Sequence, residues 1–230
     1  MSKSLLARVV SGDVWHELRT LLGVGGARRS TAIADSVALQ QFLSSRASHV
    51  AQSTLYGYLR TRGGVRYPEL FASDAFIRSI NIAKWNFWLA CLADLAVFAG
   101  GLVASRTGAS QTEVAGLMNA VVESVLGGAG IPPEAGPDYP QLADHARERV
   151  RACEWASVKD DATPFSESPA ALVRFAPVID ELKALDSEVV RNSVRFAWQD
   201  VRRDLRRDLD AAAVLASASA APATSAAGHS

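Results

Sequence analysis

The segment of residues 81–105 constrains the fold of this chain more than any other feature. Its sequence, NIAKWNFWLACLADLAVFAGGLVAS, is apolar on every helical face and long enough to cross a bilayer. A helix of that kind lies either in lipid or at the centre of a helical bundle. Asp94 falls within the run and costs about 2.5 to 3.5 kcal/mol in a membrane, which nearly cancels the gain from the apolar residues around it. We therefore expect a buried helix of a soluble bundle, with contact to lipid as the alternative.

Helical patterns fill most of the chain, and no segment shows the alternation typical of a strand. Ser30 and Thr31 offer a cap to the second helix, and Ser110 followed by Glu113 matches a capping box before the fourth. Pro177 is expected to kink or interrupt the last helix. The sequence thus predicts an all-α fold, a bundle of about five to six helices around one long apolar central helix. The expected helices cover residues 9–22, 32–62, 75–105, 111–126, 139–158 and 169–214.

Composition divides the chain into three parts. Residues 1–29 form an amphipathic basic N-terminal arm, and residues 30–210 form the helical bundle domain. A Gly/Pro-rich loop at 127–140 is a candidate hinge within that bundle. Residues 211–230 are rich in Ala and Ser, which predicts a disordered tail.

Charge and cysteine content narrow the classes of partner and compartment. The chain carries 24 basic and 24 acidic residues, so it lacks the basic excess of a general nucleic-acid binder. Its 2 cysteines do not form a CxxC pair, which favours a reduced, cytoplasmic setting. Abundant Arg and Ala indicate a bacterial, GC-rich genome. Peripheral attachment to the inner membrane through the N-terminal arm is the alternative location.

A cluster of arginines and tyrosines is the first candidate binding site. Guanidinium groups bind carboxylates and phosphates through two parallel hydrogen bonds, and phenols add polar contacts. An acidic small molecule, an anionic lipid or an acidic partner surface is the expected ligand class. The alternative interpretation is that these arginines complement the dipole at the end of a helix. This Arg/Tyr cluster consists of Tyr56, Arg60, Arg62, Arg66 and Tyr67.

Three polar residues, Lys84, Asn86 and Asp94, lie inside the apolar run. A buried charge without a partner costs several kcal/mol, so each charged residue needs one from another helix. The Arg/Tyr cluster is the expected partner of Asp94, and Glu123 is the expected partner of Lys84. These residues form either structural ion pairs or a polar ligand or proton site.

The chain shows no pattern that predicts catalysis or a metal. It contains no GxSxG, P-loop, GxGxxG or HExxH motif. Its 4 histidines are scattered, and only His145-x-x-Glu148 and Asp13-x-x-His16 resemble parts of a metal motif. We expect no metal, no cofactor and no catalytic residue, and an enzymatic activity has no candidate mechanism here.

The last predicted helix is strongly amphipathic. Two pairs of opposite charge, Asp200–Arg203 and Asp204–Arg207, lie on the face opposite its apolar stripe. Such a helix is either a solvated outer helix or an arm that docks on a partner. The apolar stripe consists of Val190, Val194, Ala197, Val201, Leu205 and Leu209.

Three functional hypotheses follow from these features. The first is a non-catalytic helical adaptor or assembly protein that binds a protein partner, with a homodimer as an alternative. The second is a bundle that binds a small molecule or lipid, with the Arg/Tyr cluster as its anion site. The third is a membrane-associated protein in which residues 81–105 or the N-terminal arm contact lipid.

Overall fold

The structure is a computed structural model, and it describes residues 32–220. Over these residues the chain is all-α, as the sequence predicts, apart from one isolated parallel β-bridge between Ile33 and Leu209. The α-helices are α3 (Ser36–Gly63), α4 (Tyr67–Leu70), α5 (Asp74–Thr107), α6 (Gln111–Ala129), α7 (Tyr139–Arg151), α8 (Ser168–Phe175), α9 (Asp180–Asp208) and α10 (Ala211–Ala220). Two short 3-10 helices, η1 (Gly64–Arg66) and η2 (Trp155–Ser157), lie in the connections.

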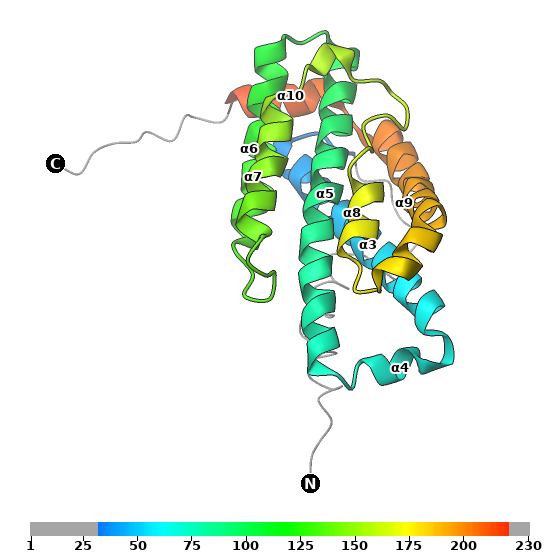
Figure 1. Ribbon diagram of the computed structural model, residues 1–230. Coiled ribbons are helices and arrows are strands. Elements are labelled where there is room, and N and C mark those ends of the chain that lie inside the picture. The colour runs from blue at the N-terminus through cyan, green and yellow to red at the C-terminus, as the bar shows by residue number, and fades with distance from the viewer. Residues whose placement is uncertain (1–31, 221–230) are drawn as a thin grey trace, which may run out of the picture.

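Helix α5 is the centre of the bundle, as expected of the apolar run. It contacts α3, α6, α7, α8 and α10, and Figure 1 shows it running the length of the molecule between α6/α7 and α8/α9. Its composition and length suffice to cross a membrane, but 89% of its most apolar window is buried inside the protein. That burial is consistent with a soluble protein, because the protein and not lipid covers the apolar surface of the helix.

Capping residues define both ends of α5, and two glycines near its C-terminal end allow another segment to pack closely against it. Ser73 caps the first turn, and the helix ends at Gly108 in the left-handed conformation. A Cβ atom added at Gly100 would lie 2.3 Å from the Trp155 ring, and one at Gly101 would lie 2.4 Å from Val158. The two glycines therefore let the η2 segment pack directly against the backbone of α5.

Helices α6 and α7 pack on each other and on α5. The predicted capping box is present, since Ser110 and Glu113 bond each other's backbone N–H groups at the start of α6. The Gly/Pro-rich loop at 127–140, the candidate hinge, follows α6 and leads into α7, which has Pro140 in its first turn. Because α6 and α7 pack on each other, this loop connects neighbouring helices of one bundle.

Several predicted boundaries were wrong. Helix α3 begins at Ser36 with Asp35 as its cap, and not after Ser30 or Thr31. The predicted helix 139–158 ends at Arg151. The predicted helix 169–214 is divided among α8, α9 and α10, with Pro177 in the first interruption, as expected.

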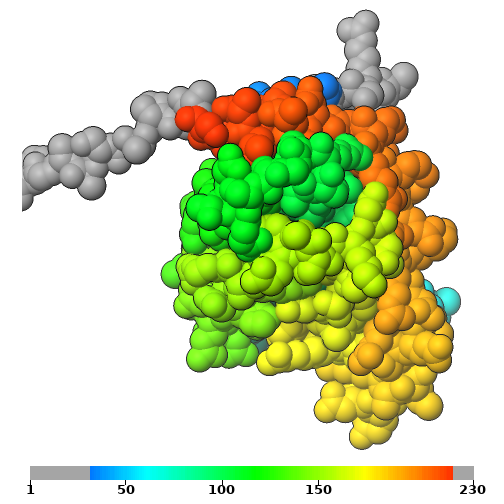
Figure 2. All heavy atoms as spheres, turned by 90° about the horizontal axis from the view of Figure 1, so that it is seen from above, coloured from blue at the N-terminus to red at the C-terminus, as the bar shows by residue number. Residues whose placement is uncertain are grey.

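The disordered tail predicted for residues 211–230 is wrong over residues 211–220. Residues 211–220 form α10, because Ala211 and Val214 are buried against the bundle. The helix lies across one end of the molecule beside the C-terminal end of α5 (Figure 2). The predicted arm at 1–29 and the rest of the predicted tail, 221–230, lie outside the described residues.

Candidate functional site

Asp94 joins the central helix to the start of α8. Its side chain is fully buried, and its two oxygens accept hydrogen bonds from the backbone N–H groups of Ser168, at 2.7 Å, and Glu167, at 3.2 Å. The first N–H groups of a helix have no partner within the helix, and the helix dipole favours negative charge there. A carboxylate from α5 therefore caps α8, which has no cap from its own side chains.

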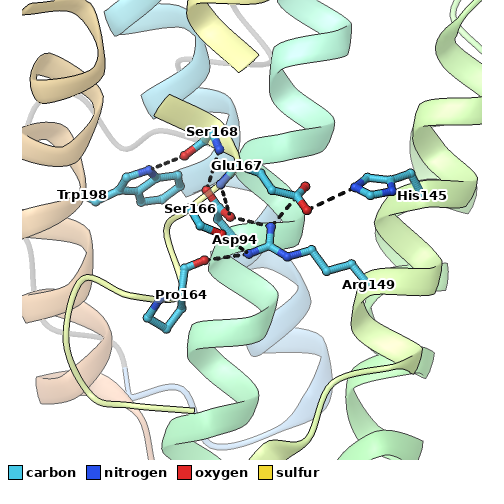
Figure 3. A network of polar contacts seen from close by, with 8 residues as sticks. All are labelled: Asp94, His145, Arg149, Pro164, Ser166, Glu167, Ser168 and Trp198. Atoms are coloured by element: carbon cyan, nitrogen blue, oxygen red, sulfur yellow. Dashed lines mark hydrogen bonds and ion pairs between the residues drawn. The ribbon is translucent and has the colours of Figure 1, made fainter. Parts of the chain in front are cut away.

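The ion-pair partner of Asp94 is Arg149 on α7, at 2.5 Å between Nη1 and Oδ1. The same guanidinium donates to the Pro164 carbonyl oxygen at 2.7 Å and lies 3.3 Å from Ser166 Oγ and from Glu167 Oε2. Figure 3 shows this network, in which α5, α7 and the segment before α8 meet around one arginine. Three elements distant in sequence are thus held together by one buried carboxylate and one guanidinium.

The predicted partners of the buried charges were wrong. The Arg/Tyr cluster does not reach Asp94, and Glu123 pairs with Arg147 at 3.0 Å and not with Lys84. The ammonium of Lys84 lies 5.1 Å from the centre of the Trp85 ring, a cation–π arrangement. Burial lowers the pKa of Lys84, partly offset by the charge of Glu134.

Burial and hydrogen bonding act in opposite directions on Asp94. Burial raises the pKa of its carboxyl group above the ordinary value, and the charge of Arg149 and the hydrogen bonds from Ser168 lower it. Burial is the largest of these effects, so the net direction is upward. Arg149 and Ser168 therefore favour the charged form of Asp94 against the effect of burial.

A cavity of about 410 Å³ borders this network between α5, α7 and α8. Ser166 and Glu167 belong both to the network and to the cavity wall. His145, Asn86 and Arg174 are the other polar groups along it. The remaining lining is apolar and consists of Leu89, Ala90, Leu142, Ala146, Ala170, Ala171 and Phe175.

Asn86 is the buried polar group of this cavity. The residue is 2% exposed, and its Oδ1 atom has no hydrogen-bond partner among the described residues. Nearer to solvent, His145 Nε2 lies 3.1 Å from Glu167 Oε1. Arg174 is exposed and lies over the Phe175 ring, 4.8 Å from its centre. The cavity therefore has a mostly apolar wall, one buried acceptor without a hydrogen-bond donor, Asn86 Oδ1, and ionisable groups at its edge.

Two arginines of the Arg/Tyr cluster pair with carboxylates of the same chain. Arg62 forms two hydrogen bonds to Asp186 on α9, which also accepts from Tyr58 at 3.0 Å. Arg66 contacts Glu69 at 3.3 Å. These two arginines therefore already have carboxylate partners from the protein itself.

The other members of the cluster, Tyr56, Arg60 and Tyr67, lie close enough to influence one another electrostatically. Burial raises the pKa of Tyr56, with a further upward contribution from the nearby Tyr67. Burial also raises the pKa of Tyr67, and the charge of Arg60 partly offsets it. None of the five predicted residues lines the cavity between α5, α7 and α8.

Of the predicted site residues, the structure therefore places Asn86 and Asp94 at one site and leaves Lys84 and the Arg/Tyr cluster apart from it. Sequence reasoning missed Arg149 and Glu167, whose positions in α7 and before α8 carry no local pattern. His145 was weighed only with Glu148 as part of a metal motif, whereas its contact is Glu167. Only burial of a charge at Asp94 signalled that some distant arginine was required.

Metal and thiolate chemistry require clustered metal ligands and reactive cysteine thiols, respectively. Among residues 32–220, no three His, Cys, Asp or Glu side chains lie close enough to hold a metal ion. Burial raises the pKa of Cys153 to about 11 and raises the pKa of Cys91 well above its ordinary value, which favours the neutral thiol at both positions. Comparison with known proteins finds no family, no curated sequence and no solved structure that matches this chain.

Proposed function

We propose that this protein is a non-catalytic helical bundle that binds a small molecule in the cavity between α5, α7 and α8. The observation that carries the proposal is the buried, unpartnered Oδ1 atom of Asn86 in the wall of that cavity. Buried polar atoms in folded proteins nearly always have a partner, and leaving one without costs about 1 to 3 kcal/mol. A ligand that donates a hydrogen bond to Asn86 would remove that cost.

The lining of the cavity indicates the class of ligand. A volume of about 410 Å³ falls within the range of small-molecule sites, and most of the wall is apolar. His145, Glu167 and Arg174 bring charges of both signs to its edge. We therefore expect a largely apolar molecule that carries a hydroxyl or amide N–H toward Asn86 and a polar end toward the edge.

Native mass spectrometry of the full chain, purified without detergent, tests this function. We expect a small-molecule adduct on the wild-type protein. The adduct should be lost in Asn86→Leu, which removes the acceptor, and in Ala170→Trp, which fills the cavity from an exposed position.

The matched control is the double variant Arg60→Ala/Arg66→Ala, which should keep the adduct. Loss of the adduct in that variant, with retention in Ala170→Trp, would move the ligand to the Arg/Tyr cluster. A wild-type protein without any adduct would count against the ligand function and favour the second candidate.

The second candidate is a helical adaptor or assembly protein, and the outer face of α9 favours it. Leu185, Val189 and Phe196 are large apolar residues exposed on that face. Photo-crosslinking from a benzophenone amino acid in place of Phe196 tests this function in cells. We expect a discrete adduct with a different protein, distinguished by its mass from a dimer of this chain, and none from the same amino acid in place of Ile131, which is equally exposed elsewhere.

A cytoplasmic location fits both candidates, and we propose it for this protein. The burial of residues 81–105 inside the bundle supports it, because that segment has little surface left to contact lipid. Membrane attachment through the predicted arm concerns residues outside the described part of the chain.

A further inference from the structure

The outer face of α9 carries an apolar stripe with the spacing of a helix–helix seam. Leu185, Val189 and Phe196 are 78%, 73% and 72% exposed, and Asn192 lies between the last two. The four residues, referred to here as the α9 seam, are separated by steps of four, three and four. That is the spacing of the positions that face a partner in paired helices.

The seam lies apart from the buried face of the same helix. Val190, Val194, Val201 and Leu205 pack into the bundle, which agrees with the outer-helix alternative for this stripe. Helix α9 forms the edge of the molecule away from α6 and α7, so its outer face is open to another molecule (Figure 1). Large apolar side chains gathered on one face of a soluble protein mark an interaction surface.

The charges beside the seam change sign along the helix. Glu181 and Glu188 flank its N-terminal half, and Arg195 flanks its C-terminal half and donates to Asn192 Oδ1 at 2.9 Å. None of these three charged residues forms an ion pair with another residue in the described part of the chain. The two halves of the seam therefore present charges of opposite sign that are free to form ion pairs with a partner.

We propose that a second copy of this chain pairs with the α9 seam in antiparallel orientation. In that orientation the acidic half of each helix faces the basic half of the other, and the pair is related by a two-fold axis. Leu185 then meets Phe196 of the second copy, and Glu188 lies within about one helical turn of its Arg195. In a parallel, in-register pair Glu188 would face Ser193 of the second copy and would have no opposite charge to meet.

The size of the seam sets the strength of the pairing. Eleven residues of helix separate Leu185 from Phe196, which is about 17 Å. A contact one helix wide and that long is smaller than the roughly 1,200 Å² expected of a stable complex. The dimer is therefore weak and forms as the protein concentration rises. This inference goes beyond the ligand proposal, since α9 supplies no residue to the cavity.

Sedimentation equilibrium of the full chain over a range of concentrations tests the pairing. We expect a monomer–dimer equilibrium that Phe196→Glu weakens at least about tenfold. The control variant is Val65→Glu, which changes an even more exposed valine on η1 and should leave the dimer unchanged. Circular dichroism confirms that each variant remains folded.

A charge-swap series tests the antiparallel orientation. Glu188→Arg and Arg195→Glu should each weaken the dimer several-fold, because each brings like charges together. The double variant Glu188→Arg/Arg195→Glu should restore it, because the pair is re-formed with its signs reversed. A chain that stays monomeric up to about 1 mM would overturn the proposal and assign the seam to another occupant. Equal weakening in the single and double swaps would overturn the orientation.

Discussion

Helix α5 carries two buried polar residues, Asp94 and Asn86, and the structure treats them in opposite ways. Around Asp94 each carboxylate oxygen has a donor, and a few residues further on Gly100 lies directly against Trp155. Around Asn86 the wall opens into a cavity of about 410 Å³, and the amide oxygen has no donor among the described residues.

Asp94 and Asn86 therefore have different roles on one helix. Both are buried in the same apolar element, so burial alone does not distinguish them. The region of Asp94 uses its polar group to join three elements, as a structural pair does. The region of Asn86 leaves both volume and hydrogen-bonding capacity unused, which is typical of a ligand site.

Removing the carboxylate should produce the largest effect. We expect Asp94→Ala to lower the free energy of unfolding by about 3 to 5 kcal/mol, because it removes the buried partner of the mostly buried Arg149 and leaves only the more exposed Glu167 at 3.3 Å. It also leaves the N–H groups of Glu167 and Ser168 at the start of α8 without an acceptor. Urea unfolding followed by circular dichroism measures the loss.

The control for that variant breaks an exposed pair on the same helix as Arg149. Glu148→Ala removes the partner of Arg151, and both side chains are largely exposed. The expected change is at most about 0.5 kcal/mol, since surface pairs contribute little. If Asp94→Ala cost no more than this control, the network would not hold the three elements together.

Adding one methyl group tests the close packing near the end of α5. Gly100→Ala should lower the free energy of unfolding by about 1 to 3 kcal/mol, because its Cβ would overlap the Trp155 ring and approach Met118. Gly116→Ala is the matched control: that glycine is helical and exposed, with nothing within 4 Å of an added Cβ. It should stabilise the protein by about 0.5 to 1 kcal/mol. No change in stability in Gly100→Ala would mean that α5 is as loosely packed around Gly100 as it is around Asn86.

Much of the fold follows from the sequence. The apolar run around Asp94, the capping box at Ser110 and the break at Pro177 are local patterns, and each predicted an observed feature. Propensity and periodicity act within a few turns, so they define elements well. They failed at Ala211, where small residues typical of a tail pack against the bundle and form a helix.

The site could be predicted only in part, because its residues meet through tertiary packing. The sequence identified Asn86 and Asp94, since a polar residue in an apolar helix is conspicuous. It did not identify Arg149, which is one of 20 arginines and lies in a helix with an ordinary exposed pattern. The Arg/Tyr cluster was conspicuous for its density, yet Arg62 binds Asp186 within the protein. Local density of charge does not reveal which charges the fold itself uses.

The smallest effect on stability is expected at Asn86, and it tests most directly how Asn86 differs from Asp94. Asn86→Leu should leave the free energy of unfolding unchanged or raise it by up to about 1 kcal/mol, because it replaces an unpartnered buried amide with an apolar group of similar length. Urea unfolding measures it, with Leu89→Ala as the control, since that buried wall residue should cost about 2 to 5 kcal/mol. A loss of more than about 2 kcal/mol in Asn86→Leu would show that the amide already has a partner. Asn86 and Asp94 would then both be satisfied within the protein, and the cavity would have no buried polar group free to bind a ligand.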